Sequence, residues 1–253
     1  MTRRIRTWFF FVSAAALAWV FFLGYRGLEP LGFVRSKYGD MVNALTVPER
    51  HITDAVTAVN FDVRGFDTLG EEFILFTSVM GVLLMMRRTD ERMGDHEDKA
   101  PGRVVPPASD AVRVAALLLL APTELFGLYM VTHGQVTPGG GFQGGVVLST
   151  APLLLYLCGE YYQFRRAVPP QVVEIGESAG AAAYILIGGA CVALGGVFLQ
   201  NFLPLGTSGS ITGGGIVPFI DLGVGLEVSG GIALALLAYL EELIEDKDIE
   251  DQK

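Results

Sequence analysis

The apolar stretch Ala111-Val-Arg-Val-Ala-Ala-Leu-Leu-Leu-Leu-Ala-Pro-Thr-Glu-Leu-Phe-Gly-Leu-Tyr-Met-Val-Thr132 decides the fold class of this chain. It is longer than the roughly 18 apolar residues that indicate a membrane-spanning helix. Further apolar runs lie on both sides of it, at residues 8–23, 73–86, 142–157, 179–199 and 219–240. The sequence therefore predicts an all-α integral membrane protein with about six transmembrane helices.

The composition agrees with a membrane protein. Charged residues are 18% of the 253 residues, whereas soluble domains have about 25%. Most of the net charge of −9 comes from an acidic tail, residues 243–253, and from Glu241 and Glu242 before it. Such a block is usually a solvated tail, and a docking tail for a partner is the alternative. The chain has no basic patch with interleaved aromatic residues, so we expect no nucleic-acid partner.

The first two apolar runs need separate interpretation. Residues 8–23 follow Arg3, Arg4 and Arg6, as in a secretory signal, but no clear small-residue cleavage site closes the run, so we expect a retained helix. Residues 73–86 are too short to span a membrane alone. This second run becomes long enough only if Gly70, Glu71 and Glu72 enter the membrane with it.

The distribution of Lys and Arg predicts the orientation. With the N-terminus inside, the inside segments hold 13 of the 18 Lys and Arg residues. Because cytoplasmic loops carry the excess of these residues, we expect both termini in the cytoplasm.

We expect four parts along the chain. Residues 1–88 form a two-helix segment whose long connection contains a short interfacial helix at residues 52–59, capped by Thr53. A charged and proline-rich cytoplasmic linker covers residues 89–110. Residues 111–242 form a four-helix domain, and the acidic tail follows. The arrangement is two helices plus four, as in a fusion of two modules.

The first stretch that suits chemistry is Arg64-Gly-Phe-Asp67-Thr-Leu-Gly-Glu71-Glu72. Asp67 and Glu71 are four residues apart and share one helical face, and Arg64 is placed to pair with Asp67 if the turn is helical. Ionisable residues at membrane depth indicate function by default. Alternatively, Asp67 and Thr68 cap the helix and the glutamates lie among lipid headgroups.

The second stretch is a glycine-rich segment, His133-Gly-Gln-Val-Thr-Pro138-Gly139-Gly140-Gly141-Phe142-Gln-Gly144-Gly145. Non-helical backbone near a membrane is tolerated where protein buries it or where it lines a wet cavity, as in transporters. The segment lacks the strand and the lysine of a phosphate-binding loop. Close helix packing through small residues is the structural alternative, and it is compatible with the functional one.

Three isolated acids, Glu124, Asp221 and Glu227, lie inside apolar runs. They must face protein or water, or be protonated, because an ionised acid facing lipid is untenable. Acids of this kind form proton or cation relays, and they also simply hydrogen-bond to neighbouring helices. We expect neither cofactor nor metal. Cys158 and Cys191 lie in apolar runs as small hydrophobes, and the histidines His51, His96 and His133 form no ligand motif.

Residues 111–242 resemble the MnhB/MrpB subunit of the Mrp-type multisubunit Na+/H+ antiporter and its relative in membrane-bound hydrogenases. The resemblance is carried by Tyr129, His133-Gly134, Pro138 to Gly145, Asn201-Phe-Leu-Pro204 and Pro218-Phe-Ile-Asp221-Leu-Gly-Val-Gly. Residues 60–86 are similar to the C-terminal end of the large MrpA-type subunit of these antiporters, a piece that hydrogenase-type complexes carry as a separate small subunit. That similarity rests on Asn60-Phe-Asp-Val-Arg64-Gly-Phe-Asp67-Thr-Leu-Gly-Glu71.

The resemblance implies a component of a hetero-oligomer in a prokaryotic inner or plasma membrane, with other membrane subunits as partners. It implies that Asp67 and Glu71 matter for ion translocation, whereas Glu124 departs from the apolar residue expected there. We expect a non-enzymatic subunit that contributes to a Na+ or H+ path, and a purely structural subunit is the alternative. The sequence does not distinguish Na+ from H+ as the ion handled, since carboxylates bind either. It also does not distinguish a secondary antiporter from a redox-driven complex.

Overall fold

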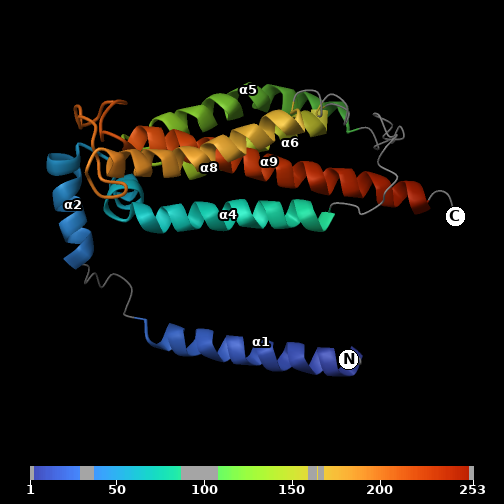
Figure 1. The fold of residues 1–253 in the computed structure, drawn as a ribbon. Coiled ribbons are helices and arrows are strands. Elements are labelled where there is room, and N and C mark those ends of the chain that lie inside the picture. Colours follow the sequence, from blue (N-terminus) through green and yellow to red (C-terminus); the bar gives the residue numbers. More distant parts are fainter. Residues whose placement is uncertain (1–2, 29–36, 87–107, 159–163, 165–167, 251–253) are drawn as a thin grey trace. The chain divides into compact units, whose positions relative to one another are not determined.

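The computed structural model describes residues 3–28, 37–86, 108–158, 164 and 168–250 (Figure 1). The side chains of residues 3, 6 and 241–250 are not part of this description. The described residues form helices, turns and loops without a strand. Six helices are long and apolar enough to cross a membrane, which confirms the predicted number of spans. The chain divides into two compact units, residues 1–40 and 41–253.

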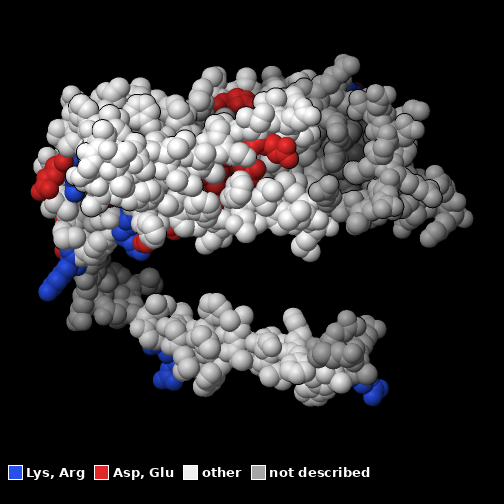
Figure 2. Space-filling view, in the orientation of Figure 1, with Lys and Arg blue, Asp and Glu red and all other residues white. Residues whose placement is uncertain are grey.

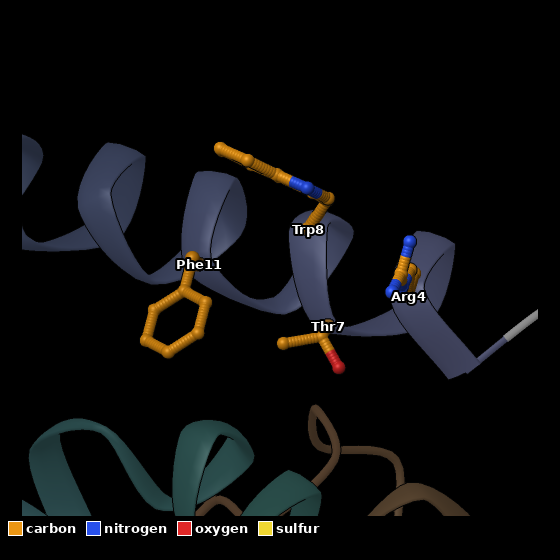
Figure 3. A pocket seen from close by; sticks show the side chains of 4 residues that line it. All are labelled: Arg4, Thr7, Trp8 and Phe11. Carbon is orange, nitrogen blue, oxygen red and sulfur yellow. The ribbon is translucent and has the colours of Figure 1, made fainter.

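The first unit contains helix α1 (Arg3–Arg26). Its large apolar side chains are exposed, including Trp8 at 72% and Phe21 at 71%. A pocket at the start of this helix is lined by side chains of α1 itself, namely Arg4, Thr7, Trp8 and Phe11 (Figure 3). An apolar surface on every side is typical of a helix whose surroundings are lipid or other subunits.

The second unit is built around its last helix. The boundary between the units falls within α2 (Lys37–Arg50), of which the second unit contains the part from Met41 onward. The second unit also contains α3 (Ala55–Ala58), the π-helical turn η1 (Val59–Val63), α4 (Gly65–Met86), α5 (Asp110–Thr132), α6 (Gly141–Cys158), α8 (Pro170–Ala193) and α9 (Val217–Glu250). Helix α9 contacts α4, α5, α6 and α8. Its residues Ile220, Val224 and Val228 are buried in the core with Tyr184 of α8 and Phe61 of η1.

Glycines let these helices approach closely. A Cβ on Gly144 of α6 would lie 2.7 Å from the backbone nitrogen of Val131 and 2.8 Å from the carbonyl oxygen of Gly127, both on α5. A Cβ on Gly180 of α8 would lie 2.6 Å from the backbone nitrogen of Glu227 on α9. Small residues therefore set the helix contacts, as is common between membrane helices that lack a hydrophobic driving force.

Two boundaries differ from the sequence prediction. The fifth span is α8, which begins at Pro170 rather than near residue 179 and ends at Ala193, because proline at a first helical position starts a helix well. The acidic tail begins as a helical continuation of α9, which reaches Glu250. The residues beyond 250 and most of the predicted linker, residues 87–107, lie outside the described residues.

The connection between the first two spans also differs. Helix α2 was not predicted, and the predicted helix at residues 52–59 is divided into α3 and η1. Thr53 does not cap it; Asp54 does, and it accepts a hydrogen bond from the backbone nitrogen of Thr57. The Thr53 hydroxyl instead donates to the carbonyl oxygen of Val136 at 2.6 Å. Tertiary contact with the glycine-rich segment outweighs the local capping preference.

The predicted division into two helices plus four follows the order of the helices along the chain, but the helices do not pack in these two groups. Helix α4 packs on α9 and α8, inside the unit that begins at residue 41. It thus completes a five-helix bundle with α5, α6, α8 and α9 (Figure 1).

Candidate functional site

The start of α4 separates its acids onto two faces. Gly65, Thr68, Glu72 and Val79 are buried at helical spacing, and Glu72 is only 3% exposed. Asp67 lies on the outer flank, half exposed, in the predicted ion pair with Arg64. The helix includes Glu71 and Glu72, as its length required, and Glu72 rather than Glu71 is the acid that enters the bundle. Acidic side chains that reach the surface of the bundle appear in red in Figure 2.

A polar cavity of about 170 Å³ lies beside Glu72. It is lined by Thr57, Asn60, Phe61, Thr68, Glu71, Glu72, Gly139, Phe142 and Gln143. Glu71 is exposed and Phe142 is 44% exposed, so the cavity reaches the surface. A water occupies roughly 30 Å³, which leaves room for several waters beside polar partners. The cavity brings together the two stretches that the sequence singled out, the start of α4 and the glycine-rich segment.

Local backbone irregularities shape the cavity wall. The π-helical turn η1 leaves the carbonyl of Asn60 to accept a hydrogen bond from the Thr68 hydroxyl at 2.7 Å. Turns of this type recur at functional sites. The Thr57 hydroxyl donates to the carbonyl of Gly134 at 2.8 Å and ties α3 to the glycine-rich segment. Gly140, which follows the lining residue Gly139, has φ of +126°, a conformation that side-chain-bearing residues rarely adopt.

Asp221 has a structural partner. It is fully buried, and its Oδ1 accepts a hydrogen bond of 2.5 Å from the backbone nitrogen of Gly141, the first residue of α6. A carboxylate at a helix N-terminus satisfies an otherwise unpaired N–H and interacts favourably with the helix dipole. This hydrogen bond ties the first residue of α6 to α9, while Oδ2 of Asp221 is buried without a hydrogen-bond partner.

Two further buried acids lie on α8 and α9. Glu227 of α9 and Glu177 of α8 are each 1% exposed. Glu227 interacts electrostatically with Glu177 and with Glu72. Sequence reasoning missed Glu177 because it placed the fifth span after residue 179. Pro170, a favoured first residue of a helix, was the signal that could have extended the span to include Glu177.

The remaining predicted site residues lie elsewhere. Glu124 is exposed on α5. His133 stacks on Tyr129 with ring centroids 4.3 Å apart, and its Nδ1 lies 3.0 Å from the Tyr129 carbonyl oxygen. Pro138 is exposed. Gly144 and Gly145 lie in α6 as packing residues against α5 and α9. Of the glycine-rich segment, Gly139, Phe142 and Gln143 line the cavity.

An ion pair outside the spans stands near the turn η1. The Nε of Arg50 lies 2.9 Å from Oδ2 of Asp62. Burial raises the pKa of Asp62, and the guanidinium of Arg50 opposes that rise. In the part of the chain that the structure describes, no three His, Cys, Asp or Glu side chains gather closely enough to hold a metal ion. Both cysteines are buried and free.

Comparison with known proteins finds relatives among the subunits of Na+/H+ antiporters. Residues 111–234 match the family described as a domain related to the MnhB subunit of Na+/H+ antiporter. The B-type subunit of a Na(+)/H(+) antiporter of Alkalihalophilus pseudofirmus is 30% identical over 135 residues, which are 51% of this chain and 88% of that protein.

Two solved structures share the fold over nearly the whole chain. A chain of the membrane-bound sulfane sulfur reductase, an archaeal respiratory membrane complex, is 28% identical with a TM-score of 0.68, covering 93% of this chain and 98% of that one. A chain of the Mrp complex from Dietzia sp. DQ12-45-1b is 25% identical with a TM-score of 0.68, covering 94% of this chain and 26% of that longer one.

Proposed function

This chain belongs to the family of Na+/H+ antiporter components that carry the MnhB-related domain, and we propose that it contributes directly to the ion path of its complex. It is a multi-pass protein of a prokaryotic plasma membrane and a membrane subunit of an antiporter-type or related respiratory complex. Its partners are other membrane subunits. Its role is transport rather than catalysis of a chemical reaction.

The observation that carries this proposal is the polar cavity beside Glu72. A carboxyl side chain that is 3% exposed, at the edge of a hydratable cavity, combines a group that binds cations or protons with a route for water. Glu71 at the surface supplies a second carboxylate at the mouth. Asp67 lies outside the cavity lining and pairs with Arg64, so we assign it a supporting role in the local field.

The test compares two equal substitutions on the same helix. Glu72→Gln removes the ionisable carboxyl group but keeps the size of the side chain, whereas Asp67→Asn makes the same change on the outer flank. In proteoliposomes that contain the assembled complex, we expect Glu72→Gln to lower cation/proton exchange by about tenfold or more and Asp67→Asn to change it little. Full exchange in an assembled Glu72→Gln complex would refute a direct role in the ion path.

A purely structural subunit is the second candidate, and the glycine contacts favour it. Gly141, Gly144 and Gly145 bring α6 against α5 and α9 with no space for side chains. That candidate predicts that enlarging Gly140 to Leu abolishes assembly, while Glu72→Gln leaves both assembly and exchange unchanged. The two candidates therefore give opposite results for one variant.

We further propose that the termini face the cytoplasm and that residues 60–86 correspond to the C-terminal end of the large, MrpA-type antiporter subunit. The excess of Lys and Arg in the inside segments supports the first proposal. Accessibility of single cysteines to a membrane-impermeant reagent, placed in the cytoplasmic linker or in the connection before α4, tests the orientation.

A further inference from the structure

Five carboxylates lie along the length of the bundle on three helices that pack together, α4, α9 and α8. They are Glu71, Glu72, Glu227, Glu177 and Glu174. Helix α4 begins beside the polar cavity, and α9 begins at the same end of the bundle, where Asp221 accepts a hydrogen bond from Gly141. Helix α8 begins at the opposite end, where Phe164 and Val168 pack with Leu237 near the far part of the α9 span. The carboxylates therefore stand at successive depths.

The helical rise gives these depths. At about 1.5 Å per residue, Glu72 lies about 10 Å from the start of α4 and Glu227 about 15 Å from the start of α9. From the opposite end, Glu177 lies about 10 Å and Glu174 about 6 Å from the start of α8. Glu177 packs against Gly230 and Gly231, which lie about 20 Å from the start of α9. The set therefore covers roughly 15–20 Å of the depth of a bilayer core, which is about 30 Å thick.

Consecutive members of this set sense one another. Electrostatic interactions join Glu71 to Glu72, Glu72 to Glu227, Glu227 to Glu177, and Glu177 to Glu174. Tyr184, buried on α8, interacts with Glu71, Glu72 and Asp221. Its hydroxyl donates to the carbonyl of Gly65. The order of these pairs matches the order of depths.

The middle three acids are buried and have unpaired oxygens. Among the described residues, Oε2 of Glu72, Oε1 of Glu177 and both carboxyl oxygens of Glu227 are buried and lack a hydrogen-bond partner. An unpaired buried carboxyl oxygen is costly. Four of them lie on three acids that interact with their neighbours in the set, and Oδ2 of Asp221 near the start of α9 is likewise unpaired. Such groups are expected where water or a transferred proton completes the hydrogen bonding.

Glycines place the central acids. Gly230 and Gly231 of α9 lie directly under Glu177, so that a Cβ on Gly231 would be 3.1 Å from Oε1 of Glu177. Gly180 of α8 lies in the same way against the backbone of Glu227. The small residues bring α8 and α9 close enough for the two carboxylates to interact.

We propose that Glu72, Glu227 and Glu177 form a proton relay that connects the polar cavity at one end of the bundle with Glu174 at the other. Glu71 collects protons at the cavity mouth, and Glu174, exposed on α8, exchanges them at the far end. Each step passes a proton from one carboxylic acid, through a bridging water, to the next carboxylate. A carboxyl group both donates and accepts a proton, so a single file of such groups suits H+ better than a metal cation, which needs several oxygens at once. The relay deepens the proposed function and rests on it.

The first experiment measures proton and sodium movement separately in proteoliposomes that contain the whole complex. Glu177→Gln is compared with Glu124→Gln, the same change on α5 and outside the relay. We expect Glu177→Gln to lower proton flux by about tenfold or more, and Glu124→Gln to leave it unchanged in complexes that assemble. Combining Glu177→Gln with Glu227→Gln should add little, because the steps are in series.

The outcomes separate the relay from the proposed function. If Glu72→Gln stops exchange but an assembled Glu177→Gln complex keeps full proton flux, the cavity role stands and the relay is wrong. If Glu72→Gln itself has no effect, both are wrong. Loss of sodium flux with proton flux intact in Glu177→Gln would also overturn the relay, because it would assign these acids to a metal cation.

A second measurement covers the case in which Glu177→Gln does not assemble. A hydrophobic carbodiimide adds to protonated carboxylic acids, and it is applied to the unmodified complex in the membrane. We expect mass spectrometry to find the adduct on Glu177 or Glu227, and proton flux to fall in proportion to labelling. The relay would be contradicted if either residue is labelled while proton flux stays unchanged, or if neither residue is labelled.

Discussion

Substituting Gly144 by alanine tests whether glycine contacts, rather than sequence propensity, hold the bundle together. The added Cβ would lie 2.7 Å from the backbone nitrogen of Val131 and 2.8 Å from the carbonyl oxygen of Gly127. Both are backbone atoms of α5, so neither moves without displacing the helix. Overpacking of this kind costs about 1–3 kcal/mol.

Gly81→Ala is the matched control. Gly81 also lies inside a membrane-spanning helix, α4, but a Cβ there would meet no atom within 4 Å. Both substitutions gain up to about 1 kcal/mol of helix propensity. Their difference therefore isolates the overpacking, about 1–3 kcal/mol, which is roughly a five- to hundredfold change in the unfolding equilibrium.

The assay is unfolding of the purified chain in mild detergent by titration with dodecyl sulfate, followed by circular dichroism. Tryptophan fluorescence does not serve, because Trp8 and Trp19 both lie in α1, outside the second unit. We expect Gly144→Ala to unfold at a lower detergent fraction than the unmodified chain, and Gly81→Ala at an equal or higher one. Equal stability of the two variants would refute the reasoning, since it would mean that α5 and α6 are not in the close contact described.

Three further predictions concern single acids. Asp221→Ala leaves the N–H of Gly141 without its acceptor and should cost about 1–3 kcal/mol in the same titration, whereas Asp221→Asn, which keeps an acceptor oxygen, should cost less. Glu124 is an exposed acid within the α5 span, and such an acid needs a polar partner inside the membrane. Glu124→Leu should therefore leave the stability of the chain unchanged or higher but weaken its co-purification with partner subunits. Undiminished co-purification would count against this prediction. Burial raises the pKa of Asp62 in the folded state. The contribution of Asp62 to stability is therefore fully present below its unfolded pKa of about 4 and is lost as the pH rises through the folded pKa. Asp62→Asn should reduce this pH dependence of stability, and an unaltered pH profile would contradict the prediction.

The sequence predicted the spans well where hydropathy alone decides them. The third and fourth runs agree with α5 and α6 to within a residue at each end, because both are bounded by polar or glycine-rich residues. The fifth run was placed nine residues too late at its start, since Glu174 and Glu177 interrupt the apolar window. Acids inside a span lower the local hydropathy, so a hydropathy criterion places the start of such a helix too late.

The sequence also identified both stretches that line the cavity, but not the way they meet. Composition marked the start of α4 and the glycine-rich segment as unusual, since acids and glycines at membrane depth are costly. The Thr57 hydroxyl of α3 donates a hydrogen bond to the carbonyl of Gly134, 77 positions away, and this contact ties the chain ahead of α4 to the glycine-rich segment. A pattern of spacing within one segment carries no information on such a contact.

What the sequence by itself determined is the number of spans, their all-helical character and the family, because these follow from local hydropathy and from a short motif of glycines and proline. Only the tertiary structure decided which acids matter. Glu71 and Glu72 are neighbours in sequence, yet one is exposed and the other is buried against α9, since adjacent residues on a helix point about 100° apart. Glu177 becomes significant only because Gly230 and Gly231 bring α9 against it. Burial and proximity are properties of packed helices, and packing decides them at residues far apart in the chain.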